Sequence, residues 1–176
     1  MKKILYILTI LLLTNITSAY AQQTINQQKS IVNFHISGGV FFKVKGTFTG
    51  MQGDFNFDSK AIENANFQIC IDAETINTSN NKRDNHLRSP DFFETETYPK
   101  ICFQSKQVVK SASGYTTIGN LSIHGVTKEV EIPFTFENNI FTGNLTINRF
   151  DYDIGLDFGT FRVGREASVT ITCVIE

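Results

Sequence analysis

The 176-residue sequence contains no tryptophan, only three histidines and no run of Lys and Arg residues. A nucleic-acid-binding surface needs clustered basic side chains to follow the phosphate backbone, and this chain has no such cluster. His35, His86 and His124 lie far apart and lack the spacing of a metal-binding motif. The sequence therefore predicts no nucleic-acid partner, no metal and no cofactor.

Long apolar runs are also missing, except for one at the N-terminus. Two lysines precede an apolar run at residues 4–13, and the motif Ala-Tyr-Ala ends at Ala21. This order is typical of a secretory signal peptide, and the run is too short to span a bilayer. We therefore expect residues 1–21 to be a cleaved signal peptide. Residues 22–176 are then one exported, most simply periplasmic, domain with no transmembrane segment.

The cysteine content is low and odd, with Cys70, Cys102 and Cys173 in strand-like segments. Their spacing matches no metal motif, and an odd number leaves at least one thiol unpaired. A cysteine in an alternating strand is most often a small buried apolar side chain. The sequence favours three unpaired thiols, with a Cys70–Cys102 disulfide as the less favoured alternative.

Alternating apolar and polar residues dominate what is present, and no convincing helical period exceeds a couple of turns. Period-two alternation joined by Gly, Asn or Ser turns predicts antiparallel strands. Because closure removes exposed strand edges, we expect an all-β, eight-stranded, antiparallel up-and-down barrel with one long loop that carries a short helix. The strand-like segments are 31–37, 42–49, 53–58, 65–77, 100–109, 115–123, 128–136, 140–148 and 167–175.

The 16 phenylalanines supply much of the predicted interior. An eight-stranded barrel can fill its interior with side chains or leave room for one slim ligand. Strand parity assigns nine apolar side chains to the inward faces: Phe34, Ile36, Phe48, Phe55, Phe57, Phe67, Ile69, Ile71 and Phe103.

One long interruption separates Ile76 from Lys100. Ser89 followed by Pro90 has the pattern of a helix start, with Ser as N-cap and Pro at the first helical position. We expect a short helix there. It would turn three apolar side chains toward the barrel interior: Leu87, Phe92 and Phe93.

The same loop concentrates charge in four side chains: Arg83, Asp84, His86 and Arg88. A catalytic interpretation would use His86 as an acid or base. However, no Ser or Cys nucleophile with a matched base accompanies it. Charged clusters also form structural networks. The favoured prediction is a polar network, built on ion pairs, that holds the loop against the barrel rim.

Several segments together form a pattern that is specific as a set. The charged loop from Arg83 to Pro99 is the most specific, together with the pattern from Gly119 to Val130. The others are residues 32–36, residues 45–58, and Arg149 with Asp151. With these segments the chain resembles the YceI family, over about residues 30–175. The resemblance implies a lipocalin-like barrel, exported from the cell, that holds a polyprenyl or quinone-like isoprenoid lipid. It also allows a homodimer, and it supplies no catalytic residues.

Three functions are compatible with the sequence. The favoured one is a non-enzymatic carrier of a long isoprenoid chain in the barrel interior. The second is an enzyme that acts on an amphiphilic substrate at the barrel mouth, using His86. The third is a ligand-free structural or stress-related barrel whose interior is packed with phenylalanine rings.

Overall fold

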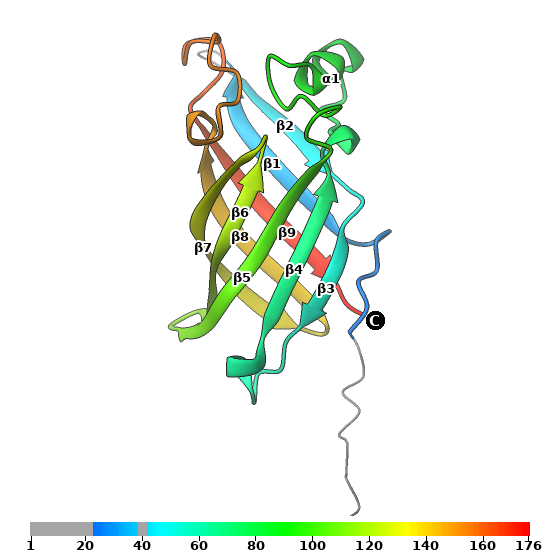
Figure 1. Ribbon diagram of the computed structural model, residues 1–176, viewed down its shortest axis with the longest axis vertical. Coiled ribbons are helices and arrows are strands. Elements are labelled where there is room, and N and C mark those ends of the chain that lie inside the picture. Colours follow the sequence, from blue (N-terminus) through cyan, green and yellow to red (C-terminus); the bar gives the residue numbers. More distant parts are fainter. Residues whose placement is uncertain (1–22, 39–41) are drawn as a thin grey trace, which may run out of the picture.

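The computed structural model describes residues 23–38 and 42–176, so the predicted signal peptide, residues 1–21, lies outside the described residues. The described chain forms one antiparallel sheet of nine strands, which confirms the predicted all-β class (Figure 1). The strands are β1 (Ile31–Gly38), β2 (Phe42–Phe48), β3 (Gln52–Asn56), β4 (Asn66–Asp72), β5 (Lys100–Ser111), β6 (Gly114–Ile123), β7 (Val126–Glu137), β8 (Ile140–Asn148) and β9 (Glu166–Val174).

Most neighbours in the sheet are also neighbours in the sequence, and tight turns connect the strands from β5 to β8. The β6–β7 turn places His124 and Gly125 at positive φ, and the β7–β8 turn does the same with Asn138 and Asn139. Turns with two successive positive φ values match the twist of paired strands, and they favour Gly and Asn. These turns fix the register from β6 through β8.

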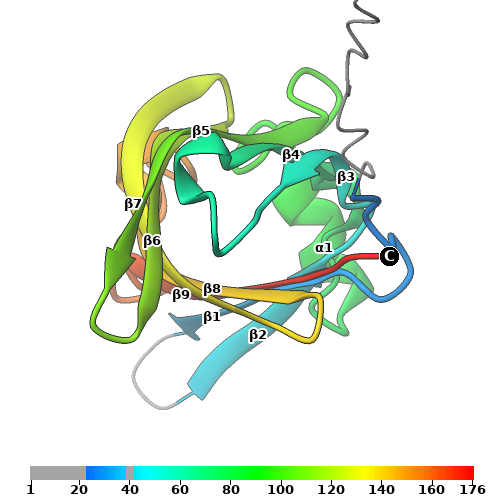
Figure 2. The same cartoon turned by 90° about the horizontal axis from the view of Figure 1, so that it is seen from below.

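The sheet order begins at β2 and ends at β3, two strands that follow each other in the chain. The sheet curls around its interior (Figure 2), and within the described residues no hydrogen-bonded ladder joins these two edges. The chain instead crosses from one edge to the other at Gly50, whose φ is 71°. The sheet has nine strands rather than the expected eight because all nine strand-like segments of the sequence form strands, with β2 and β3 on either side of this bend.

The segment before β1 covers part of this seam. Gln23 forms an isolated bridge with Phe55 of β3, and Ile25 forms another with Ile175 after β9. The Gln23 side chain also accepts a hydrogen bond from the Phe57 N–H at 2.8 Å. The described N-terminal residues therefore connect the β3 edge to the far end of β9.

The helix lies before Ser89 rather than after it, so the predicted helix start is wrong. Helix α1 spans Asn81–Arg88 (Figure 1), with Asn80 as N-cap and Ser89 as C-cap. The Asn80 side chain accepts a hydrogen bond from the Arg83 N–H at 3.0 Å. Pro90 is therefore a stop signal just past the helix, a position where proline is also common.

The cysteine prediction is also wrong, because Cys70 and Cys102 form a disulfide. The two residues face each other directly in the β4–β5 register. Strand alternation places them on the opposite side of the pair from Ile69 and Ile71. Cys173 is unpaired and buried. The odd count is thus resolved as one cross-strand bridge and one buried thiol.

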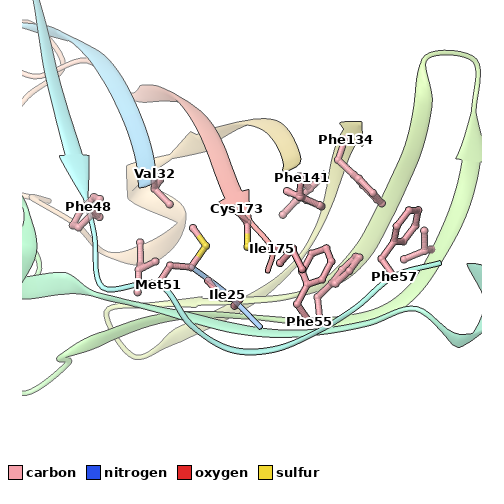
Figure 3. Close-up of a cluster of buried hydrophobic side chains, with 14 of the residues drawn as sticks. Ile25, Val32, Phe48, Met51, Phe55, Phe57, Phe134, Phe141, Cys173 and Ile175 are labelled. Carbon is pink, nitrogen blue, oxygen red and sulfur yellow. The ribbon is translucent and has the colours of Figure 1, made fainter. Parts of the chain in front are cut away.

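Aromatic rings pack tightly at the end of the barrel that is distant from α1. Phe134 and Phe141 stack with their ring centroids 4.5 Å apart, and Phe55 and Phe67 stack at 4.9 Å. Phe57 adds edge-on contacts to this cluster (Figure 3). All five side chains are buried. The rings therefore close one end of the barrel interior.

Candidate functional site

The other part of the barrel interior is hollow and forms a cavity of about 210 Å³. The aromatic cluster bounds it at one end. Helix α1, the segment after it and the loop before β9 bound it at the other (Figure 1). Only one charged side chain, Arg149, lies among the described residues that line it. The cavity is therefore built to exclude water from an apolar occupant.

Strand alternation makes the wall apolar. Along β9, Ala167, Val169, Ile171 and Cys173 line the cavity, while the residues between them do not. Val169 sits opposite Phe34 of β1 in the strand register. Because every second side chain of a strand points to the same face, a strand such as β9 contributes a stripe of apolar side chains.

Eleven of the twelve side chains that the sequence assigned to an apolar cavity line it. Phe57 is the exception. Its ring packs against Tyr115 at 4.9 Å and Phe136 at 5.1 Å between centroids, within the closed aromatic end. The eleven lining residues are Phe34, Ile36, Phe48, Phe55, Phe67, Ile69, Ile71, Leu87, Phe92, Phe93 and Phe103.

The cover of the cavity joins two segments that lie far apart in the sequence. The Phe93 ring packs edge-on against Phe48 of β2 at 5.5 Å between centroids. The Phe92 ring lies 4.8 Å from that of Phe158, which belongs to the loop before β9. The His86 ring contacts Phe158 at 5.2 Å and so also spans both segments. The predicted inward placement of the Phe pair agrees with this arrangement.

The charged residues of α1 hold the helix through backbone groups rather than through ion pairs with one another. Asp84 is buried and accepts hydrogen bonds from the N–H and the hydroxyl of Thr78. Arg83 donates from Nε to the Thr78 hydroxyl at 2.7 Å and from Nη2 to the Thr78 carbonyl at 2.8 Å. Both side chains therefore fasten α1 to one residue of the preceding segment.

Arg88 makes the same kind of contact at the other end of the helix. It donates to the carbonyls of Glu74 and Ile76, each at 2.8 Å. The predicted ion pairs among these four residues do not form: Asp84 accepts from Thr78, whereas Arg83 and Arg88 donate mainly to backbone carbonyls. His86 pairs with Asp91 at 2.8 Å in an exposed position and does not line the cavity.

Arg149 organises the remaining part of the cover. Its guanidinium donates to the carbonyls of Gly164, Ile154, Gly155, Phe158 and Val163, which engages every nitrogen. The side chain is only 4% exposed, and this desolvation lowers its pKa from the usual value. Five bonds from one buried planar group fix the path of the loop 153–165.

In the sequence, Arg149 stands out only as part of a family pattern. A single arginine beside an acidic loop gives no local signal that it will turn inward and bind five carbonyls. The carbonyls that it serves come from residues 154–164, and loop conformation decides where they point. Position in the fold, rather than residue type, identifies this residue.

A second contact missed by the sequence analysis fastens the segment after α1 to the β6–β7 turn. The His124 Nδ1 lies 3.1 Å from the Tyr152 carbonyl, and its Nε2 lies 3.6 Å from a Glu94 carboxylate oxygen. The Tyr98 ring packs edge-on against the imidazole at 4.9 Å. Among the described residues, no group of three His, Cys, Asp or Glu side chains is placed to hold a metal ion.

The comparison with protein families identifies this architecture. The model of the YceI-like domain matches residues 23–175, essentially the whole described chain. The chain belongs to the YceI family. The resemblance inferred from the sequence is therefore confirmed.

YceI relatives agree in sequence over most of their length. A UPF0312 protein of Yersinia enterocolitica is 32% identical over 142 residues, covering 75% of this chain and 74% of its own. A UPF0312 protein of Vibrio parahaemolyticus is 31% identical over 134 residues, covering 70% of this chain and 71% of its own.

Two solved structures share the fold. BcnA of Burkholderia cenocepacia superposes with a TM-score of 0.78 at 23% identity, covering 86% of this chain and 99% of its own. A polyisoprenoid-binding domain from Saccharophagus degradans gives a TM-score of 0.68 at 18% identity, covering 89% and 99%. No helix in the described part of this YceI protein is both long and apolar enough to cross a bilayer.

Proposed function

We propose that this YceI-family protein is an exported, non-enzymatic binding protein that holds the chain of one isoprenoid lipid in its cavity. The observation that carries the proposal is the cavity lining. Among the described residues that form it, the only charged side chain is Arg149, which already donates to five carbonyls. No donor of that guanidinium is left for a polar head group. The cavity therefore selects an apolar chain and leaves the head group at its edge.

Burial of apolar surface supplies enough free energy for such binding. Each methylene-sized group removed from water contributes about 0.8 kcal/mol. A chain that buries about ten such groups gains roughly 8 kcal/mol before the entropic cost of association. Useful affinity thus requires no charged contact. The isoprenoid class is taken from the structural likeness to a polyisoprenoid-binding domain.

The arrangement around His86 favours binding over catalysis. His86 pairs with the exposed Asp91, and its ring is held between Phe92 and Phe158. A general base must lie within hydrogen-bond reach of a substrate group, but His86 does not line the cavity. Its ring instead helps to close the cover.

Two features support export. The N-terminal residues have the order of charge, apolar run and small-residue site that signal peptides share. The Cys70–Cys102 disulfide is of the kind that persists in oxidising compartments such as the periplasm. We therefore place the mature protein, from about residue 22, in the periplasm.

Calorimetric titration of delipidated protein tests the binding proposal. The probes are geranylgeraniol and an unbranched alcohol of the same chain length. Two variants, Ala167→Trp and Val169→Phe, fill the cavity from β9. The matched control is Val109→Trp on the exposed side of β5. Unchanged circular dichroism and melting temperature identify the variants that fold.

We expect wild-type protein and Val109→Trp to bind geranylgeraniol with one site per chain, and folded cavity variants to bind at least about tenfold more weakly. Equal binding by wild type and cavity variants would place the ligand elsewhere and overturn the proposal. Equal affinity for geranylgeraniol and the unbranched alcohol would mean that the cavity binds long apolar chains without a preference for isoprenoids.

A further inference from the structure

The loop 153–165 carries the two most exposed large apolar side chains of the described structure. Phe161 is 77% exposed and Leu156 is 58% exposed. Within the described residues, the Phe161 ring packs against no other aromatic ring, whereas most phenylalanines are paired. We call Leu156 and Phe161 the loop tip.

The loop tip stands on a fixed base. Arg149 binds five carbonyls between residues 154 and 164, and the Gly164 N–H donates to the Ser37 carbonyl of β1 at 2.8 Å. A loop that needed only to connect two elements could bury its apolar side chains against the barrel. Here the same bonds that order the loop hold Leu156 and Phe161 away from it.

The other side of this loop lines the cavity. Ile154 and Val163 both contribute to the cavity wall, and Phe158 packs on Phe92 in the cover. The loop therefore has one apolar side in the cavity and one in solvent. Figure 1 shows it beside α1 at the end of the barrel opposite the C-terminus.

The charges around the loop tip fit a lipid surface. Arg162 follows Phe161 directly, and Arg165 lies at the end of the loop; both are exposed. Asp153 and Asp157, both exposed, are the opposing charges of the same loop. Aromatic and aliphatic side chains enter the boundary between head groups and acyl chains, while adjacent arginines contact phosphates. Two apolar side chains make such an association weak and reversible.

We propose that the loop tip inserts into the interface of a phospholipid bilayer and sets the covered end of the cavity against the membrane. This inference rests on the proposed function, because a carrier must exchange a poorly soluble chain with the bilayer that contains it. The bilayer removes Leu156 and Phe161 from water. Movement at the contacts of Phe158 then opens a path from the acyl region to the cavity.

The lack of tryptophan provides a direct reporter. Phe161→Trp introduces a single indole at the loop tip, and Val109→Trp places one on the exposed side of β5 as a control. We expect vesicles of phosphatidylethanolamine and phosphatidylglycerol in equal amounts to blue-shift the emission of Phe161→Trp and to leave Val109→Trp unchanged. Equal spectra with and without vesicles for both variants would overturn the docking.

Co-sedimentation with the same vesicles measures the contribution of the tip. The Leu156→Ser/Phe161→Ser double variant should bind at least about tenfold more weakly than wild type. The Val109→Ser/Ile140→Ser variant, which removes exposed apolar side chains elsewhere, should bind as wild type. Equal sedimentation of both double variants would show that the tip does not contact bilayers, and would leave a protein partner as its occupant.

Titration with geranylgeraniol separates this inference from the proposed function. The loop-tip variant should bind geranylgeraniol as wild type does but extract it from vesicles more slowly. If wild type binds the alcohol yet never sediments with vesicles, the docking fails and the carrier function stands. If vesicle binding depends on the tip but no isoprenoid binds, the carrier function fails and the docking stands.

Discussion

The carboxylate of Asp84 accepts a hydrogen bond from the backbone N–H of Thr78 at 2.9 Å and a second one from the hydroxyl of the same residue. Both residues are buried, although Asp84 lies in the first turn of α1 and Thr78 lies in the segment before the helix. Asn77, next to Thr78, forms an isolated bridge with Thr47 of β2. The Asp84–Thr78 pair therefore attaches α1 to the segment that is bonded to the β2 edge of the sheet. This attachment fixes α1 where its Leu87 side chain lines the cavity.

Replacement of Asp84 by Ala should lower the free energy of unfolding by about 1–3 kcal/mol, because it leaves the buried donors of Thr78 without their acceptor. Thr78→Val removes only the hydroxyl and should cost less. Asp91→Ala breaks an exposed pair with His86 and should change stability by less than about 1 kcal/mol. Urea denaturation measures all three. Equal costs for Asp84→Ala and Asp91→Ala would contradict the role of the buried pair.

Arg149→Lys should loosen the loop 153–165 even though the charge is retained. An ammonium group has three donors at one point and cannot serve five separated carbonyls. We expect a loss of about 3 kcal/mol in the free energy of unfolding, since buried carbonyls lose their donors. Chymotrypsin should also cleave the native variant faster near Phe158 and Phe161. Arg165→Lys, at an exposed position, is the control, and identical protease protection of both variants would contradict the role of the five Arg149 bonds in ordering the loop.

Thiol counting tests the disulfide and the burial of Cys173. Native protein should show no thiol that reacts with a chromogenic disulfide reagent, because Cys173 is buried and Cys70 is bonded to Cys102. Unfolding without reductant should expose one thiol, and unfolding with prior reduction should expose three. Three reactive thiols in unreduced, unfolded protein would restore the unpaired arrangement that the sequence favoured.

Cys173 also gives the stability a defined dependence on pH. Burial raises the pKa of its thiol from 9.0 to about 11, so the folded state keeps a proton that the unfolded state loses first. The contribution of this thiol to stability is therefore complete below pH 9 and is lost as the pH rises toward 11. Denaturation between pH 8 and pH 11 should show a steeper decline for wild type than for Cys173→Ala. Parallel declines would mean that the thiol ionises equally in both states.

Local patterns predicted the strands and their inward faces well, since strand period and turn residues depend on near neighbours. Eight of the eleven lining residues follow from parity alone, and Leu87, Phe92 and Phe93 follow from the inward side predicted for the loop. Phe57 continues the parity of Phe55, but the curl of the sheet carries it past the cavity into the aromatic end. Strand parity predicts the face of the sheet on which a side chain lies, but it does not predict the position of that side chain along the barrel axis.

The errors share a cause, because each depended on segments that meet only in the folded chain. Ser89-Pro90 carries a cap signal, but the helix that forms is capped by Asn80 and places Asp84 within hydrogen-bond reach of Thr78. The Cys70–Cys102 bridge needs the β4–β5 register, which residue spacing does not supply. The carbonyls bound by Arg149 depend on loop conformation in the same way.

The central claim is that the cavity holds an isoprenoid chain, and the most direct test is the composition of its occupant. The measurement is mass spectrometry of the organic extract from protein secreted by its own cells and purified without detergent. Ala167→Trp serves as the variant with a filled cavity. We expect one polyprenyl or quinone-type lipid per wild-type chain and none with the folded variant. An empty extract from folded wild-type protein that also refuses added isoprenoids would contradict the account.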